Sequence, residues 1–296
     1  MTELIQETLK NMKPEKDFFI GIDSDGCAFD TMEIKQKECF IPNIIKYWNL
    51  QPISKYVRET QEFVNLYSMW RGMNRFPALV MVFDLLKERP EVKKRGVKIP
   101  EVKSLKEWIK KEAKLSNPAL KTAVEKTGDP ILKIALQWSE AVNRTVADIV
   151  KDIPPFPFVK ESLKKAKEKA DVIVVSATPN EALQREWDEH GMSQYARAIC
   201  GQELGSKKEQ IALTAGGKYK KEHILMVGDA LGDLQAAREN KTLFYPINPS
   251  REEESWERFY NEALDRFFDE KYAGTYELEL IEKFEKYLPS IPPWGK

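Results

Sequence analysis

A short apolar run in this chain stops abruptly at two carboxylates. Residues 18–22 are apolar or glycine, and Asp23 and Asp25 follow with one residue between them. The run lacks polar alternation and is too short for a helix of its own, so we predict a strand buried on both faces. Gly26 then allows the chain to turn away. Because ligands of open parallel sheets bind at the carboxyl ends of strands, the two acids indicate chemistry rather than solubility.

Two later apolar runs, residues 172–175 and 224–227, show the same pattern. Each is followed by polar groups or glycine near its end: Ser176, Gly228, Asp229 and Asp233. Parallel strands end at one edge of their sheet, so neighbouring strands would bring these groups to the first acidic pair. The sequence therefore predicts a single polar site built from three strand ends.

The acids of this site require a compensating charge. The group comprises Asp23, Asp25, Asp229 and Asp233. Carboxylates gathered in a low-dielectric cleft cannot all stay ionised unless a cation neutralises them. The set offers only oxygen ligands, which favours a hard ion such as Mg²⁺ over zinc. An EF-hand is excluded, because Cys27, Ala28 and Ile34 stand where that loop needs an oxygen ligand, glycine and glutamate.

These motifs resemble those of the haloacid dehalogenase superfamily, specifically its phosphatase branch. Residues 23–26 match the first motif, Ser176 the second, Lys207 the third and residues 228–233 the acidic fourth. Cys27 departs from the Thr or Val that usually follows the first motif. The resemblance implies an α/β fold whose core is a Rossmann-like parallel sheet flanked by helices.

The resemblance also implies a role for each motif residue. Asp23 would be the nucleophile that forms an aspartyl-phosphate, and Asp25 would be the general acid and base. Phosphate oxygens would be bound by Ser176, Ala177 and Lys207. The Mg²⁺ ligands would be Asp23, the main-chain carbonyl of Asp25, Asp229 and Asp233.

The third motif offers two adjacent lysines. Lys207 lies four residues before Ile211, so on a helix it shares the face of that apolar residue, whereas Lys208 points elsewhere. We therefore select Lys207, with the alternative that both lysines are solvated charges at the end of a loop.

Residues 31–154 have helical rather than strand-like patterns. Apolar residues recur at three-to-four spacing, and prolines separate the periodic stretches. We predict an all-helical domain over 31–154 and an α/β core over 1–30 and 155–296 that includes a C-terminal helical extension. The proline-rich run 153–158 would be a stiff linker.

The position of this helical insert, between the first and second motifs, resembles that of a family cap domain. Such a cap could close over the site and exclude water. Candidate substrate contacts within it are Arg71, Asn74 and Arg75, which could bind a second anionic or hydroxylated part of a substrate. The alternative is a solvated helix end with ordinary ion pairs.

Composition narrows the class of partner. The chain of 296 residues has 47 basic and 47 acidic side chains, so no global charge attracts nucleic acid or acidic membranes. Three cysteines without metal-type spacing suit a reducing compartment, and we predict a cytoplasmic protein. No apolar stretch is long enough to cross a bilayer. The sequence gives no indication of the oligomeric state.

The sequence thus predicts an enzyme, a magnesium-dependent phosphatase acting on a small phosphorylated metabolite. A phosphomutase with the same aspartyl-phosphate stays open, as does a non-catalytic binding protein with this fold. Four chemically competent motifs argue against the second alternative. Dehalogenation is disfavoured because it needs neither Asp25 as a proton donor nor the acidic fourth motif.

Overall fold

The computed structural model describes residues 2–295, with side chains from Gln6 onward. The chain forms two compact units. The first comprises the residues up to Thr31 with Asp152–Tyr287, and the second comprises Met32–Lys151 with the residues from Leu288 onward. The helical domain predicted at 31–154 has boundaries close to those of the long segment of the second unit.

The first unit contains a five-stranded sheet with the order β3-β2-β1-β4-β5, and every neighbouring pair is parallel. Its strands are β1 (Phe18–Ile22), β2 (Ala170–Val175), β3 (Ala198–Cys200), β4 (Ile224–Gly228) and β5 (Leu243–Pro246). The predicted Rossmann-like parallel sheet is confirmed. Because β1 lies between β2 and β4, the three strands that carry the motif residues are direct neighbours.

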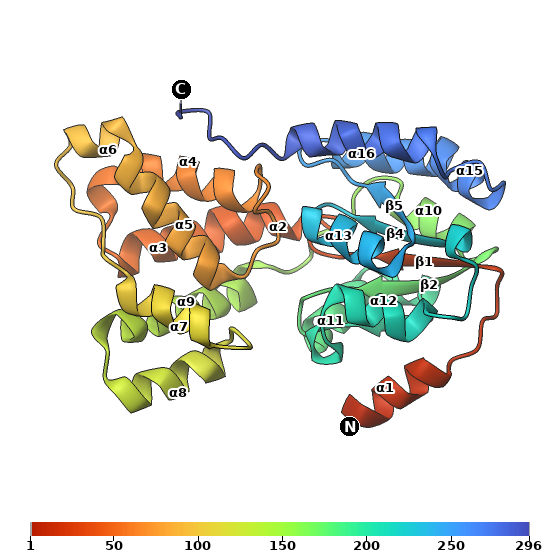
Figure 1. Cartoon of the computed structure of the whole chain (residues 1–296), viewed down its shortest axis with the longest axis horizontal. Helices are drawn as coiled ribbons and strands as arrows, with labels where there is room; N and C mark the ends of the chain where they lie inside the picture. The colour runs from red at the N-terminus through yellow and green to blue at the C-terminus, as the bar shows by residue number, and fades with distance from the viewer. Residues whose placement is uncertain (1, 296) are drawn as a thin grey trace. The chain divides into compact units, whose positions relative to one another are not determined.

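Helices cover both faces of this sheet. The helices of the first unit are α1 (Thr2–Asn11), α10 (Val159–Ala166), α11 (Asn180–Glu189), α12 (Lys207–Ala215), α13 (Leu231–Asn240), α14 (Glu252–Arg258), α15 (Leu264–Phe268) and α16 (Thr275–Tyr287). The unit also contains a π-helical turn at Phe259–Ala263 and 3₁₀ turns at Ser193–Tyr195, Gln202–Leu204 and Lys221–His223. Alternate strand residues such as Ile20, Val172 and Leu225 form one buried core with α10, α14 and α15. Figure 1 shows α12 and α13 side by side in front of the strands.

The loop after β1 is a tight turn held by a single carbonyl group. The oxygen of Ser24 accepts hydrogen bonds from the backbone N–H groups of Cys27, Ala28 and Phe29, at 3.2, 2.9 and 3.1 Å. Gly26 has a φ of +76°, a conformation that glycine adopts without steric cost. The two acids of the first motif are therefore carried by a turn with a fixed backbone.

The second unit is helical. Its helices are α2 (Thr31–Ile34), which begins at the last residue of the first unit, α3 (Ile41–Tyr47), α4 (Ser54–Asn65), α5 (Arg75–Glu88), α6 (Pro90–Lys94), α7 (Lys103–Lys111), α8 (Asn117–Thr127) and α9 (Pro130–Ile149), with a π-helical segment at Lys35–Phe40 and a 3₁₀ turn at Gln51–Ile53. The helices pack chiefly as the pairs α4 with α5 and α8 with α9. Within residues 2–295, no helix combines the length and apolar character that a bilayer span requires.

The C-terminal tail packs in the second unit, which differs from the assignment of all residues 155–296 to the α/β core. α16 ends at Tyr287, and the indole of Trp294 lies 4.3 Å from the guanidinium carbon of Arg89. The same indole meets the Phe63 ring edge to face, with the ring centres 5.5 Å apart. The tail is proline-rich and has no periodic pattern, so only these tertiary contacts show where it docks.

Replacing Trp294 by alanine tests this docking. We expect the free energy of local unfolding of α4 to fall by about 1–2 kcal/mol, because an aromatic pair and a cation–π contact are lost. Hydrogen exchange of the α4 amides measures the change. Ile291→Ala is the matched control, since Ile291 lies in the same tail but is 67% exposed. Equal α4 protection in the two variants would contradict the docking.

Candidate active site

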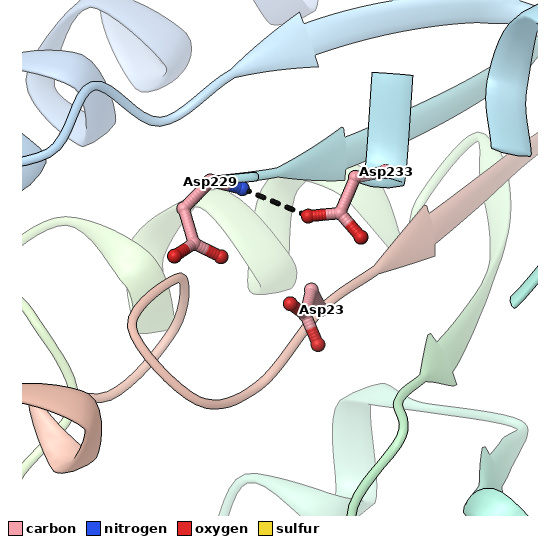
Figure 2. A group of neighbouring side chains, drawn as sticks. All are labelled: Asp23, Asp229 and Asp233. Carbon is pink, nitrogen blue, oxygen red and sulfur yellow. Dashed lines mark hydrogen bonds between the residues drawn. The ribbon is translucent and has the colours of Figure 1, made fainter. Parts of the chain in front are cut away.

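Three carboxylates meet at the carboxyl edge of the parallel sheet. Asp23 follows β1, Asp229 follows β4, and Asp233 lies in the first turn of α13. One carboxylate oxygen from each residue lies within 4.8 Å of the other two, and none of the three residues is more than 5% exposed. Figure 2 shows the side chains pointing toward one shared space. The predicted convergence of strand ends therefore occurs for these three acids.

Gly228 permits the close approach of Asp233. A Cβ atom added to Gly228 would lie 2.4 Å from the Cβ of Asp233, closer than real Cβ atoms come. The Oδ2 atom of Asp233 accepts a hydrogen bond from the N–H of Asp229 at 3.1 Å, which Figure 2 shows. It accepts a second one from the N–H of Ala230, also at 3.1 Å. The glycine and the N–H groups together fix this carboxylate over the end of β4.

Lys207, the first residue of α12, supplies a positive charge to the cluster. Its Nζ lies 2.6 Å from Oδ2 of Asp23 and 2.5 Å from Oδ1 of Asp233. Lys208 is instead 56% exposed and pairs with Glu239 at 3.0 Å. Of the two candidate lysines, the structure thus places Lys207 among the acids.

Burial sets the electrostatics of the cluster. Desolvation raises the pKa of Asp23 well above its usual range, Asp233 and Asp229 raise it further, and Lys207 opposes them. Burial alone would lower the pKa of Lys207, but the three acids outweigh it and raise that pKa. The lysine is therefore charged at neutral pH. The ammonium of Lys207 contacts Asp23 and Asp233, and the pKa of Asp23 remains raised despite this contact.

The donor set fits a metal ion. Asp23, Asp229 and Asp233 each present a carboxylate oxygen to the same space. Three oxygen donors with no histidine or cysteine among them suit a hard divalent ion. These residues can therefore hold a metal of the magnesium class.

The carboxylate of Asp25 lies outside this cluster. Its Oδ2 accepts a hydrogen bond from the hydroxyl of Thr178 at 2.7 Å, and its Oδ1 accepts one from the hydroxyl of Thr31. The expected convergence of four carboxylates is thus corrected to three, because the tight turn after β1 directs this side chain to the two hydroxyls. The predicted contact of Asp25 with a metal ion would be made by its main-chain carbonyl, so it does not depend on the position of the carboxylate.

Ser176 lies at the end of β2, in a loop held by a buried glutamine. Its backbone N–H donates to the Cys200 carbonyl at 3.0 Å and to Oε1 of Gln210 at 3.1 Å. Its hydroxyl oxygen accepts a hydrogen bond from the Thr178 N–H at 3.2 Å. The next residue, Ala177, is exposed. The loop predicted to bind phosphate is therefore rigid at its first residue and open at its second.

Gln210 is a site residue that the sequence reasoning missed. It is fully buried on α12, three residues after Lys207, and its side-chain amide donates to the carbonyls of Ser176, Gly201 and Gly205 at 2.9–3.0 Å. It fixes the second-motif loop to the helix that carries the lysine. A glutamine on the inward face of that helix was the available signal.

The three candidate substrate contacts make hydrogen bonds within the second unit. Arg71 is 5% exposed and donates to the carbonyl of Leu66 at 2.9 Å. Asn74 caps the N-terminus of α5. Arg75 donates to the hydroxyl of Ser139 at 2.9 Å. These contacts give the three residues structural roles, and their contacts with a substrate stay predictions.

Gly228→Ala tests the packing of the acidic cluster. The new methyl group would displace Asp233, so we expect a loss of about 1–3 kcal/mol in the free energy of unfolding, measured by chemical denaturation. Gly232→Ala is the matched control, because a Cβ at Gly232 meets open space. Equal stability of the two variants would refute the steric argument.

A family model described as haloacid dehalogenase-like hydrolase matches residues 99–245. The comparison with curated protein sequences gives no match.

Among solved structures, the chain is similar to a haloacid dehalogenase-like family hydrolase from Streptococcus pneumoniae, with 13% identity, a TM-score of 0.43 and coverage of 83% of this chain and 91% of that one. It is also similar to a predicted phosphoglycolate phosphatase from Haemophilus somnus, with 16% identity, a TM-score of 0.41 and coverage of 79% and 86%. A predicted phosphatase from Clostridium acetobutylicum gives 12% identity, a TM-score of 0.43 and coverage of 78% and 85%.

The matched residues include the second, third and fourth motifs together with β2, β3 and β4 of the parallel sheet, and the first motif precedes them. The chain belongs to the haloacid dehalogenase-like hydrolases.

Proposed function

We propose that this hydrolase is a magnesium-dependent phosphatase that acts on a small phosphorylated metabolite through an aspartyl-phosphate. The observation that carries the proposal is the buried group of Asp23, Asp229, Asp233 and Lys207 at the sheet edge. Such a group combines a nucleophile, ligands for a hard cation and a fixed positive charge. Phosphoryl transfer needs these same parts, because its catalysis rests on positioning and charge stabilisation.

Asp23 would attack the phosphorus atom of the substrate. One carboxylate oxygen forms the new bond to phosphorus, and the bond to the ester oxygen breaks. The backbone N–H of Ser24 donates to Oδ1 of Asp23 at 2.8 Å, and Lys207 contacts Oδ2. These contacts orient the nucleophile, and the lysine favours its ionised form. Lys207 and the Ser176 loop would also receive charge from the transferring phosphoryl group.

Asp25 would move the protons of both steps. In the first step it protonates the departing alkoxide, and in the second it accepts a proton from the water that hydrolyses the aspartyl-phosphate. Its position between the hydroxyls of Thr31 and Thr178, outside the acidic cluster, supports this separate role. A carboxylate bound to the cation could not exchange protons as readily.

Asp23, Asp229 and Asp233, with the main-chain carbonyl of Asp25, would hold Mg²⁺. When bound, this ion would neutralise the carboxylates that otherwise repel a phosphate dianion. The second, helical unit would serve as a cap that excludes water during the reaction. The cytoplasmic location inferred from the cysteines stays a prediction.

A phosphatase screen over a library of phosphorylated metabolites, with and without Mg²⁺, tests this function. We expect Mg²⁺-dependent release of phosphate, and we expect Asp23→Asn to lower the rate by about a thousandfold or more because the nucleophile is lost. Lys207→Met should also lose activity, whereas the matched variant Lys208→Met should retain it. Turnover by Asp23→Asn at the wild-type rate would overturn the nucleophile assignment.

The proton-transfer role of Asp25 gives a separate prediction. Asp25→Asn should slow hydrolysis of an alkyl phosphate by about a hundredfold or more, because the alkoxide needs a proton as it leaves. An activated aryl phosphate, whose leaving group is stable as an anion, should lose much less. Steady-state rates on the two substrates measure the difference. Equal losses would argue against the acid role.

A further inference from the structure

Ser24, between the two acids of the first motif, makes side-chain hydrogen bonds that the proposed chemistry does not use. It is fully buried. The indole N–H of Trp187 donates to its hydroxyl oxygen at 2.9 Å, and the hydroxyl lies 2.9 Å from Oε2 of Glu186. An indole N–H can only donate and a carboxylate only accepts, so the hydroxyl accepts from the tryptophan and donates to the glutamate. Both bonding directions of this hydroxyl are therefore used.

The backbone of Ser24 controls the positions of both neighbouring acids. Its N–H donates to Oδ1 of Asp23 at 2.8 Å. Its carbonyl accepts the three N–H groups that define the turn after β1. A shift of Ser24 would therefore move the carboxylate of Asp23 and also the turn that carries Asp25.

One partner of Ser24, Trp187, belongs to the buried core of the first unit. Trp187 lies in α11, is fully buried, and meets the ring of Phe29 edge to face with the ring centres 5.8 Å apart. Its carbonyl accepts a hydrogen bond from the N–H of Met192 at 2.7 Å. The ring of Trp187 is thus fixed by its packing against Phe29, and its backbone is fixed by the hydrogen bond from Met192 near the end of α11.

The segment of chain that supplies these partners touches the first motif a second time. Thr178, just before α11, donates to Oδ2 of Asp25 at 2.7 Å. The loop that follows β2 and the helix after it therefore hold the first-motif turn at two points. One point is the Asp25 carboxylate, and the other is the Ser24 hydroxyl.

From these contacts we infer that Ser24 is a positioning residue, which the Trp187 indole and the Glu186 carboxylate orient so that Asp23 and Asp25 keep their reactive geometry. The inference rests on the proposed function, because it assigns these acids to catalysis. Loss of the hydroxyl would leave the buried indole N–H without its acceptor and release the turn from α11. Small displacements of a nucleophile have large effects on rate.

Steady-state kinetics on the best substrate of the phosphatase screen tests the inference. We expect Ser24→Ala and Trp187→Phe each to lower kcat by about tenfold to a hundredfold, with KM changed less than about twofold. Because the two changes remove one shared hydrogen bond, the double variant should be no slower than Ser24→Ala. Glu186→Gln keeps an acceptor oxygen and should retain kcat, whereas Glu186→Leu should lose it.

A matched control separates positioning from stability. Ser255 is equally buried, and its hydroxyl donates to the Arg251 carbonyl at 2.7 Å and accepts from the Asn248 N–H at 3.0 Å. We expect Ser255→Ala to lower Tm while kcat stays at the wild-type value. Wild-type kcat in Ser24→Ala would overturn the inference, as would an equal loss of kcat in Ser255→Ala.

Hydrogen exchange tests the positioning role of Ser24 without a measurement of turnover. Ser24→Ala should speed hydrogen exchange at the amides of Cys27, Ala28 and Phe29, which bond to the Ser24 carbonyl. Unchanged exchange at these amides would refute the positioning role whatever the kinetics.

The two proposals fail in different ways. If Asp23→Asn kept its activity, the proposed function would fail. If Asp23→Asn were inactive while Ser24→Ala kept wild-type kcat, the positioning role alone would fail.

Discussion

The burial of three carboxylates against a single ammonium group is the constraint on which the candidate site depends. Lys207 makes ion pairs with Asp23 and Asp233, and Asp229 lies in the same buried group. Burial of a charged carboxylate is costly unless the group is paired and hydrogen-bonded. The remaining negative charge is compatible with the fold because hydrogen-bond donors and, in our proposal, a divalent cation complete the neutralisation. The same excess charge would make the site receptive to a cation and, through it, to a phosphate group.

The parallel sheet makes this charge arrangement possible. With β1 between β2 and β4, the residues that follow three neighbouring strands share one edge. Local features then set the fine geometry. Gly228 admits Asp233 to the edge, and Gln210 ties the Ser176 loop to the helix that carries Lys207. A site of this kind is positioned by the scaffold rather than by flexible loops, which suits chemistry that depends on alignment.

The first-motif turn connects this scaffold to the proposed catalytic steps. Its backbone is fixed by the Ser24 carbonyl, and its side chains are held from the segment between β2 and α11. The separation of Asp25 from the acidic cluster follows from that turn. In our proposal the two acids therefore have different roles, because Asp23 faces the cation and Asp25 faces the leaving group.

The sequence alone determined the strands and their buried character, and it favoured Lys207 over Lys208, because hydrophobic periodicity and the ends of apolar runs are local signals. It also marked the helical insert, whose three-to-four spacing is visible without neighbours. Only the tertiary structure decided which acids meet, since a turn rather than a spacing directs Asp25 to two threonine hydroxyls. The same holds for the tail, where Trp294 docks on Arg89 through contacts between segments far apart in the chain, and for Gln210, whose role arises from carbonyls on three different loops or strand ends. Long-range contacts of this kind leave no periodic pattern, and for that physical reason they could not be predicted from the chain.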